Sequence, residues 1–62
     1  MNYNELTKLL KQAGWRFYRN GKGSHKIWFH PERQYQIPVP DHGSKEIKPV
    51  LVKTIKKQAG IE

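Results

Sequence analysis

The apolar residues near the N-terminus repeat at the spacing of one helix face: they are Leu6, Leu9, Leu10 and Ala13. Asn2 is a suitable N-cap, and Glu5 follows it at the capping-box position. Gly14 stands where a glycine commonly ends a helix. The pattern predicts an amphipathic helix over residues 2–13.

The next part of the chain changes to the two-residue alternation of β-strands. Aromatic and β-branched residues favour strands at residues 15–19, 24–30 and 35–39. Residues 20–23 form a turn that begins with Asn-Gly, the strongest short signal for a hairpin. Pro38 lies inside the third predicted strand, so we expect that strand at a sheet edge, because proline cannot donate a ladder hydrogen bond.

Alternation also assigns the side chains of the second predicted strand to two faces. His25, Ile27 and Phe29 share one of them. If Ile27 and Phe29 face the helices, His25 points toward the helix-packed side or its edge. A β-bulge near Gly23 would change this orientation.

A second amphipathic helix is predicted from Pro49 to about Ala59, with Gly60 ending it. Its apolar stripe consists of Leu51, Val52, Ile55 and Ala59. The element order predicts a single domain over residues 1–62 with an α+β fold, α-β-β-β-α. We expect a three-stranded antiparallel sheet with both helices on one face and the other face open.

Charge narrows the class of partner. Twelve Lys and Arg side chains against five Asp and Glu give the 62-residue chain a net charge of +7. Such a field favours polyanions, with nucleic acid first among them. The chain has no cysteine, no apolar signal segment and no run near the ~20 apolar residues of a membrane span. We therefore expect a soluble, cytoplasmic protein that contacts no membrane.

One segment combines a flexible turn, positive charge and an acid–base group. Gly23 and Ser24 precede His25, and Lys22 and Lys26 flank it. Unperturbed histidine titrates near pH ~6.5, so it can act as an acid or a base near neutrality. RNA cleavage needs such a group and requires no metal, because the 2′-hydroxyl nucleophile belongs to the substrate.

Other chemistry is weakly supported. The histidines lack zinc-site spacing, and we expect no metal and no cofactor. A triad of Ser24, His25 and Asp41 is disfavoured, because adjacent residues on a strand point to opposite faces. His30 is expected to be an exposed turn residue, and His42 lies in a polar loop.

Several larger side chains have two possible roles. Three aromatic residues could stack on bases but are expected in the core, namely Trp15, Trp28 and Tyr35. The lysines near the C-terminus form a solvated helix face or a phosphate-binding surface, and they are Lys45, Lys48, Lys53, Lys56 and Lys57.

Four segments, in order along nearly the whole chain, resemble the HicA (YcfA-like) toxins of toxin–antitoxin pairs. They are Lys-Gln-Ala-Gly-Trp at 11–15, Lys-Gly-Ser-His-Lys-Ile-Trp at 22–28, Ile-Pro-Val-Pro-Asp-His at 37–42 and Thr-Ile-Lys-Lys-Gln-Ala-Gly-Ile at 54–61. No single segment is decisive, but the four together are specific.

The resemblance implies a fold like the double-stranded-RNA-binding domain and metal-independent cleavage of mRNA that arrests translation. It also implies that His25 is the catalytic residue, with Gly23 and Ser24 beside it. His42 matches a recurrent family position and is the candidate for a second catalytic group. The implied partner is a HicB-like antitoxin that covers the active site.

Positive charge is expected to guide both RNA and an acidic antitoxin to the same surface. The candidate RNA-binding residues are Arg16, Arg19, Lys22, Lys26 and Arg33. Two other functions fit the same composition: a non-catalytic RNA-binding module, and an interaction protein whose basic surface docks an acidic partner. Only the chemistry of His25 separates the first of these from a ribonuclease.

Overall fold

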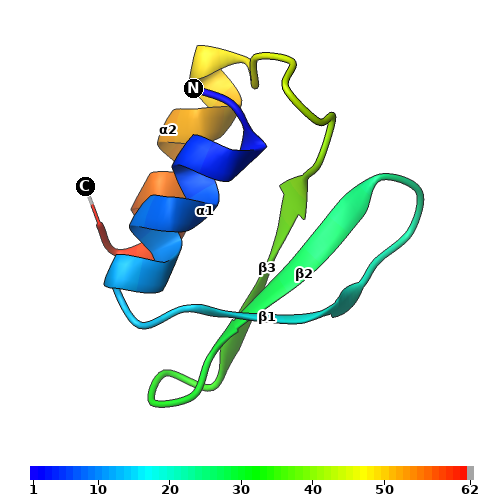
Figure 1. Cartoon of the computed structure of the whole chain (residues 1–62). Helices are drawn as coiled ribbons and strands as arrows, with labels where there is room; N and C mark the ends of the chain where they lie inside the picture. Colours follow the sequence, from blue (N-terminus) through cyan, green and yellow to red (C-terminus); the bar gives the residue numbers. More distant parts are fainter. Residues whose placement is uncertain (62) are drawn as a thin grey trace.

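In the computed structural model, which describes residues 1–61, the chain has the predicted order α-β-β-β-α (Figure 1). The elements are α1 (Tyr3–Gln12), β1 (Arg16–Asn20), β2 (His25–His30), β3 (Tyr35–Pro40) and α2 (Pro49–Ala59). The strands form one antiparallel sheet in the order β1-β2-β3. The predicted α+β class and the edge position of the proline-containing strand are confirmed, and the predicted boundaries differ by about one residue.

The helix ends form for the reasons that the sequence indicates. The Asn2 side chain accepts a hydrogen bond from the Glu5 backbone N–H at 3.0 Å, and the Glu5 carboxylate accepts one from the Asn2 N–H at 3.0 Å. This reciprocal pair satisfies two N–H groups that have no partner within the helix. Pro49 begins α2, and Gly60 ends it in the left-handed conformation with φ +74°.

One face of the sheet packs against both helices, as Figure 1 shows. The buried residues are Leu6, Leu10, Trp15, Trp28, Ile37, Val39, Ile47, Ile55 and Ala59. The expected burial of Trp28 is confirmed, and it decides the orientation of β2 that the sequence left open: Trp28 faces the helices, and Ile27 and Phe29 do not. One expectation about the core is wrong, because Leu51 of the predicted apolar stripe is 40% exposed on α2. The indole is the largest side chain of the strand and gains most from burial.

Face alternation in β2 therefore places His25, Ile27 and Phe29 on the side away from the helices. The strand pairing is regular between β2 and β3, from His25 opposite Pro40 to His30 opposite Tyr35. The irregularity lies in β1 instead of near Gly23, because the register with β2 shifts between Phe17 and Arg19.

The buried Trp28 side chain needs a partner for its indole N–H. The Tyr3 hydroxyl in α1 accepts this hydrogen bond at 3.1 Å, and the two rings meet edge to face. Burial raises the pKa of Tyr3, the hydrogen bond from Trp28 opposes this shift, and the charge of Asp41 adds to it. The contact fixes α1 over the middle of the sheet.

We expect Tyr3→Phe to lower the free energy of unfolding by about 1–3 kcal/mol, because the indole N–H loses its acceptor in a half-buried site. Urea denaturation at neutral pH measures the change. Tyr35→Phe is the matched control, because the Tyr35 side chain is 44% exposed and its hydroxyl makes no hydrogen bond within residues 1–61. An equal effect of the two substitutions would contradict the role given to the Tyr3 hydroxyl.

Candidate active site

His25 is presented by the tight turn that joins β1 to β2. Gly23 has φ +62°, a conformation that favours glycine, although a Cβ there would meet no atom within 4 Å. The His25 N–H donates to the Lys22 carbonyl at 3.2 Å, and the Gly21 N–H donates to the His25 carbonyl at 2.8 Å. The backbone of His25 is thus held on both sides while its side chain is exposed.

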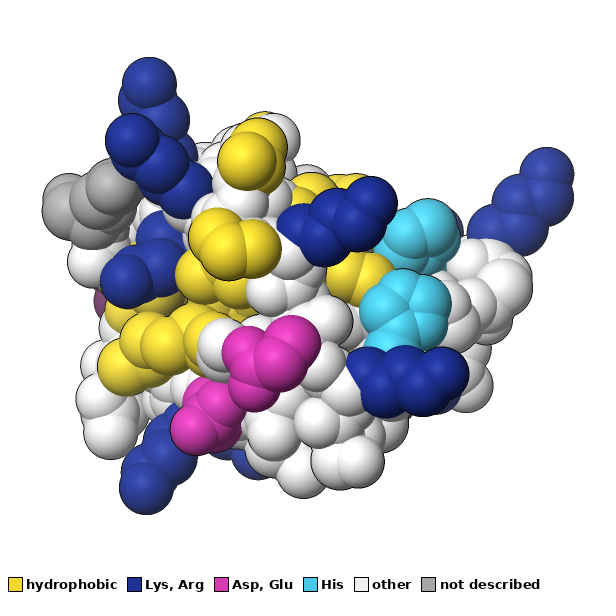
Figure 2. Space-filling model, turned by 90° about the horizontal axis from the view of Figure 1, so that it is seen from above, with side chains coloured by type: hydrophobic (Ala, Val, Ile, Leu, Met, Phe, Trp, Pro, Cys, Tyr) yellow, Lys and Arg dark blue, Asp and Glu magenta, His cyan; other side chains and the backbone are white. Residues whose placement is uncertain are grey.

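The loop after β3 places His42 at the same end of the sheet as His25. The Asp41 N–H donates to the Ser24 carbonyl at 2.9 Å, and His25 pairs with Pro40. The Asp41 carboxylate accepts from the Gly43 N–H at 3.0 Å, which closes a turn around His42. Figure 2, a view from above, shows histidine side chains next to lysine or arginine side chains. Two imidazoles at one end of the sheet can supply an acid and a base.

The structure does not form the weakly supported triad. Ser24 and His25 are both exposed, and the Asp41 carboxylate bonds to the Gly43 backbone. Within residues 1–61, no hydrogen bond joins the side chains of Ser24, His25 and Asp41, and no three His, Asp or Glu side chains gather as a metal site.

His30 has a structural position at the opposite end of β2. One ring nitrogen, Nε2, lies 3.1 Å from the Ala13 carbonyl, and Nδ1 lies 3.3 Å from the Arg33 N–H. Because a carbonyl only accepts and an N–H only donates, these partners fit the neutral ring with its hydrogen on Nε2. The expectation of an exposed turn residue is wrong, since His30 is half-buried against Trp15.

The five candidate RNA-binding cations do not lie together. Arg19 and Lys22 are exposed at the turn that presents His25. The Lys26 ammonium donates to the Asn20 side chain at 2.7 Å, which holds it across the same hairpin. Arg19 and Lys22 lie on the hairpin that presents the candidate catalytic histidine, whereas alternation places Lys26 with Trp28 on the opposite face of β2 from His25.

The other two lie near the far end of the sheet. The Arg16 guanidinium donates to the Trp15 carbonyl at 2.9 Å. The Arg33 guanidinium donates to the Ala59 carbonyl at 2.8 Å and lies 5.9 Å from the centre of the Trp15 ring. The structure therefore separates Arg33 from His25 and gives its charge a role at the C-terminal end of α2.

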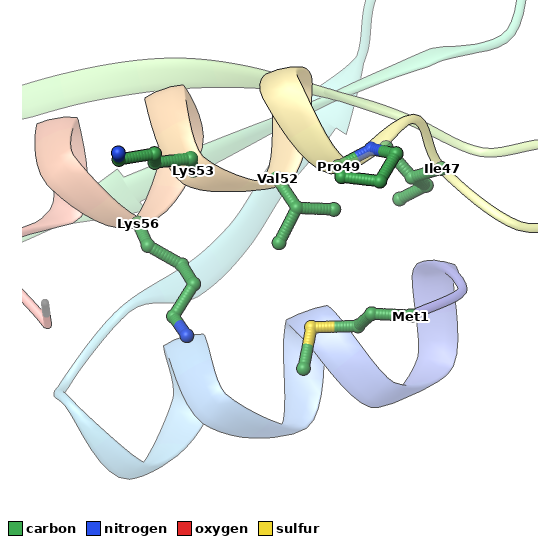
Figure 3. Close-up of a pocket in the computed structure, with 6 residues that line it drawn as sticks. All are labelled: Met1, Ile47, Pro49, Val52, Lys53 and Lys56. Carbon is green, nitrogen blue, oxygen red and sulfur yellow. The ribbon is translucent and has the colours of Figure 1, made fainter.

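Neither of the two clearest hollows of the surface contains His25. One is a groove of about 230 Å³ between the helices, lined by Met1, Ile47, Pro49, Val52, Lys53 and Lys56 (Figure 3). The other includes His30 and Gly14 at the far end of the sheet. The candidate active site is thus an exposed surface, which suits a polymer better than an enclosed small molecule.

Over residues 3–61 the chain matches the family described as HicA toxin of bacterial toxin–antitoxin systems. The chain belongs to the HicA toxin family. It is also 40% identical to the probable mRNA interferase HicA of Pseudomonas fluorescens (strain Pf0-1), over all of this chain and 98% of that protein. No solved structure matches the chain significantly. No helix in residues 1–61 is long and apolar enough to cross a membrane.

The sequence did not reveal a pair of aromatic side chains on the open face of this HicA fold. Tyr18 is 55% exposed, and its ring centroid lies 5.7 Å from that of Phe29. Trp15 and Trp28 are core residues, as expected, whereas the expectation of a core position for Tyr35 is wrong, because its side chain is 44% exposed. The alternation of β1 does separate Tyr18 from Trp15, but its partner could be identified only from the strand pairing.

We expect Arg33→Ala to lower the free energy of unfolding by about 1.5–3 kcal/mol, the range for a hydrogen bond that involves a charged group. Arg19→Ala should change it by no more than about 0.5 kcal/mol, because the side chain is exposed and makes one long bond to a neighbouring carbonyl. Urea denaturation of both variants tests the assignment. Equal free energies of unfolding for the two variants would contradict the structural role of Arg33, which would then remain a candidate RNA-binding residue.

Proposed function

We propose that this chain is the toxin of a type II toxin–antitoxin pair and an endoribonuclease that cleaves mRNA and arrests translation. Membership of the HicA toxin family and the name of its relative, a probable mRNA interferase, support this function. The observation that carries the proposal is the exposure of His25 on a fixed turn, with the exposed cations Arg19 and Lys22 on the same hairpin. A polyanion can reach this imidazole from solvent.

In the proposed reaction, a base takes the proton of a ribose 2′-hydroxyl. The 2′-oxygen then attacks the adjacent phosphorus, and the bond from phosphorus to the 5′-oxygen breaks as an acid protonates that oxygen. The products are a 2′,3′-cyclic phosphate and a 5′-hydroxyl. His25 acts as one of the two proton-transfer groups, and Arg19 and Lys22 stabilise the negative charge on the phosphorane.

A single imidazole cannot be the base and the acid in the same step. His42 is the candidate for the second group, because the bond between Asp41 and Ser24 holds its loop at the His25 end of the sheet. Gly23 and Ser24 contribute through the turn that positions His25. The reaction as proposed needs no metal, and mRNA places it in the cytoplasm.

We expect His25→Ala to reduce the rate of RNA cleavage about 10²- to 10⁴-fold, the usual contribution of a general acid or base. The assay follows a 5′-labelled mRNA fragment in EDTA, which the wild-type activity should survive. His42→Ala should give a comparable loss of cleavage rate. It should also change the dependence of that rate on pH from a bell shape to a curve with a single limb. Circular dichroism confirms that both variants are folded.

A substrate with a single 2′-deoxynucleotide at the cleaved position is the chemical control, because it lacks the nucleophile and should stay intact. Wild-type cleavage by the His25→Ala variant would overturn the assignment of the catalytic residue. RNA binding without any cleavage by the wild-type chain would favour the non-catalytic RNA-binding module. Activity lost in EDTA and restored by Mg²⁺ or Zn²⁺ would reveal a metal requirement.

The proposed inhibitor is a HicB-like antitoxin that binds over His25. Positive charge near this residue attracts an acidic surface as well as RNA, so both ligands are directed to one place. Glu32, in the turn between β2 and β3, lies at the far end of the sheet. Its negative charge therefore does not offset the positive charge near His25. Binding of RNA and of the antitoxin should therefore be mutually exclusive.

Competition between these two ligands is measurable with the His25→Ala variant, which binds RNA without cutting it. The apparent RNA dissociation constant should rise in proportion to the concentration of added antitoxin. Formation of a ternary complex with undiminished RNA affinity for the toxin's surface would contradict the blocking mechanism.

A further inference from the structure

The open face of the sheet carries an aromatic pair that the core does not use. The rings of Tyr18 and Phe29 have centroids 5.7 Å apart and planes inclined at 38°. Phe29 is half-buried, whereas Tyr18 is 55% exposed. The core on the opposite face is built around Trp15 and Trp28. Tyr18 therefore presents an aromatic face to solvent, and Phe29 supports it.

The strand geometry explains why this ring lies where it does. Burial of Trp28 turns Phe29 to the open face by alternation. The pairing of β1 with β2 passes from Phe17 opposite Trp28 to Arg19 opposite Ile27, so Tyr18 is the extra residue of a β-bulge. Bulges redirect side chains, and this one places the tyrosine ring beside Phe29.

The aromatic pair is aligned with the candidate catalytic residue. His25, Ile27 and Phe29 are alternate residues of β2 on the same face. At the rise of a β-strand, Phe29 lies about 13 Å from His25 along the strand. Arg19 pairs with Ile27, midway between them. The open face thus presents an imidazole, then a cation, then an aromatic ring.

This order matches the alternation of phosphate and base in a nucleic-acid strand. We infer that the open face is a binding track for single-stranded RNA, in which one base stacks on Tyr18 while a phosphate lies at His25. Arg19 contacts the intervening phosphates, and Phe29 positions the tyrosine ring. The inference rests on the proposed ribonuclease function and names its substrate form.

A single strand fits this surface better than a duplex. Bases in a duplex are stacked on one another, so their faces cannot reach a protein ring, whereas single strands present unstacked bases to aromatic side chains. Stacking on one aromatic residue contributes enough that its removal weakens binding measurably. RNA and the antitoxin are both expected at this face. An aromatic ring, a cation and an acid–base group in line fit a strand of RNA, which offers bases and phosphates in turn.

Fluorescence anisotropy with a labelled 12-nucleotide single-stranded RNA tests the inference in the His25→Ala background. Tyr18→Leu should weaken binding about 5- to 160-fold, the range for loss of one base–aromatic stack. Tyr18→Phe keeps the ring and should bind as the parent does. Tyr35→Leu is the matched control, because Tyr35 is 44% exposed on the same sheet but lies on the helix side, near Trp15.

Two further measurements separate stacking from a general loss of affinity. The fluorescence of 2-aminopurine placed in the RNA should be quenched on binding when residue 18 is tyrosine or phenylalanine. It should not be quenched when residue 18 is leucine. Binding of a 12-base-pair duplex RNA should be the same for the Tyr18→Leu and parent chains. Circular dichroism shows whether each variant is folded.

Equal affinity of Tyr18→Leu and Tyr35→Leu for the single strand would overturn the inference, as would equal losses for single strand and duplex. An unchanged RNA affinity combined with weaker antitoxin binding would assign the aromatic pair to the protein partner instead. These results are independent of the proposed catalysis. If the His25→Ala chain cleaves RNA, the catalytic assignment fails while the stacking result still stands.

Discussion

Burial of the Trp28 indole under α1 determines the orientation of every other side chain in β2. The indole is 2% exposed, and its N–H donates to Tyr3. Because strand side chains alternate, this one contact directs His25 and Phe29 to the opposite face. A shift of one residue would bury these two and expose the indole. The central strand therefore stabilises the fold on one face and presents its chemistry on the other.

The sequence predicts the parts of this fold that depend on local signals. The capping box of Asn2 and Glu5 and the terminating Gly60 act over a few residues, so their pattern can be read directly. The orientation of β2 could not be read in this way. Ile27, Trp28 and Phe29 are consecutive apolar residues, so alternation fits either face, and tertiary packing with Tyr3 decides between them.

The candidate site was likewise predictable only in part. The exposure of His25 follows from its glycine turn, and the hydrogen bond from Asp41 to Ser24 brings the loop of His42 to it. The structural role of Arg33 at the end of α2 could not be predicted from the sequence, because the Ala59 carbonyl that it binds lies 26 residues away along the chain. The contact between Tyr18 and Phe29 could not be predicted from the sequence either, because it depends on a one-residue bulge.

The two ends of the sheet carry different groups of side chains, one bonded to the backbone and one exposed, and this difference bears on the proposed binding of RNA to the open face. His30 and Arg33 are held by backbone partners at one end, while Arg19 and Lys22 remain exposed on the hairpin of His25 at the other. Phosphate contacts weaken with salt because counterions compete for them, whereas aromatic stacking involves no charge. In the proposed RNA complex, the cations therefore act mainly on the rate of encounter at physiological ionic strength, and the Tyr18 ring contributes to the affinity that remains. An inhibitor that neutralised only the cations would slow RNA binding without abolishing it. We therefore expect effective inhibition to require a partner that covers the aromatic end of the face as well as His25.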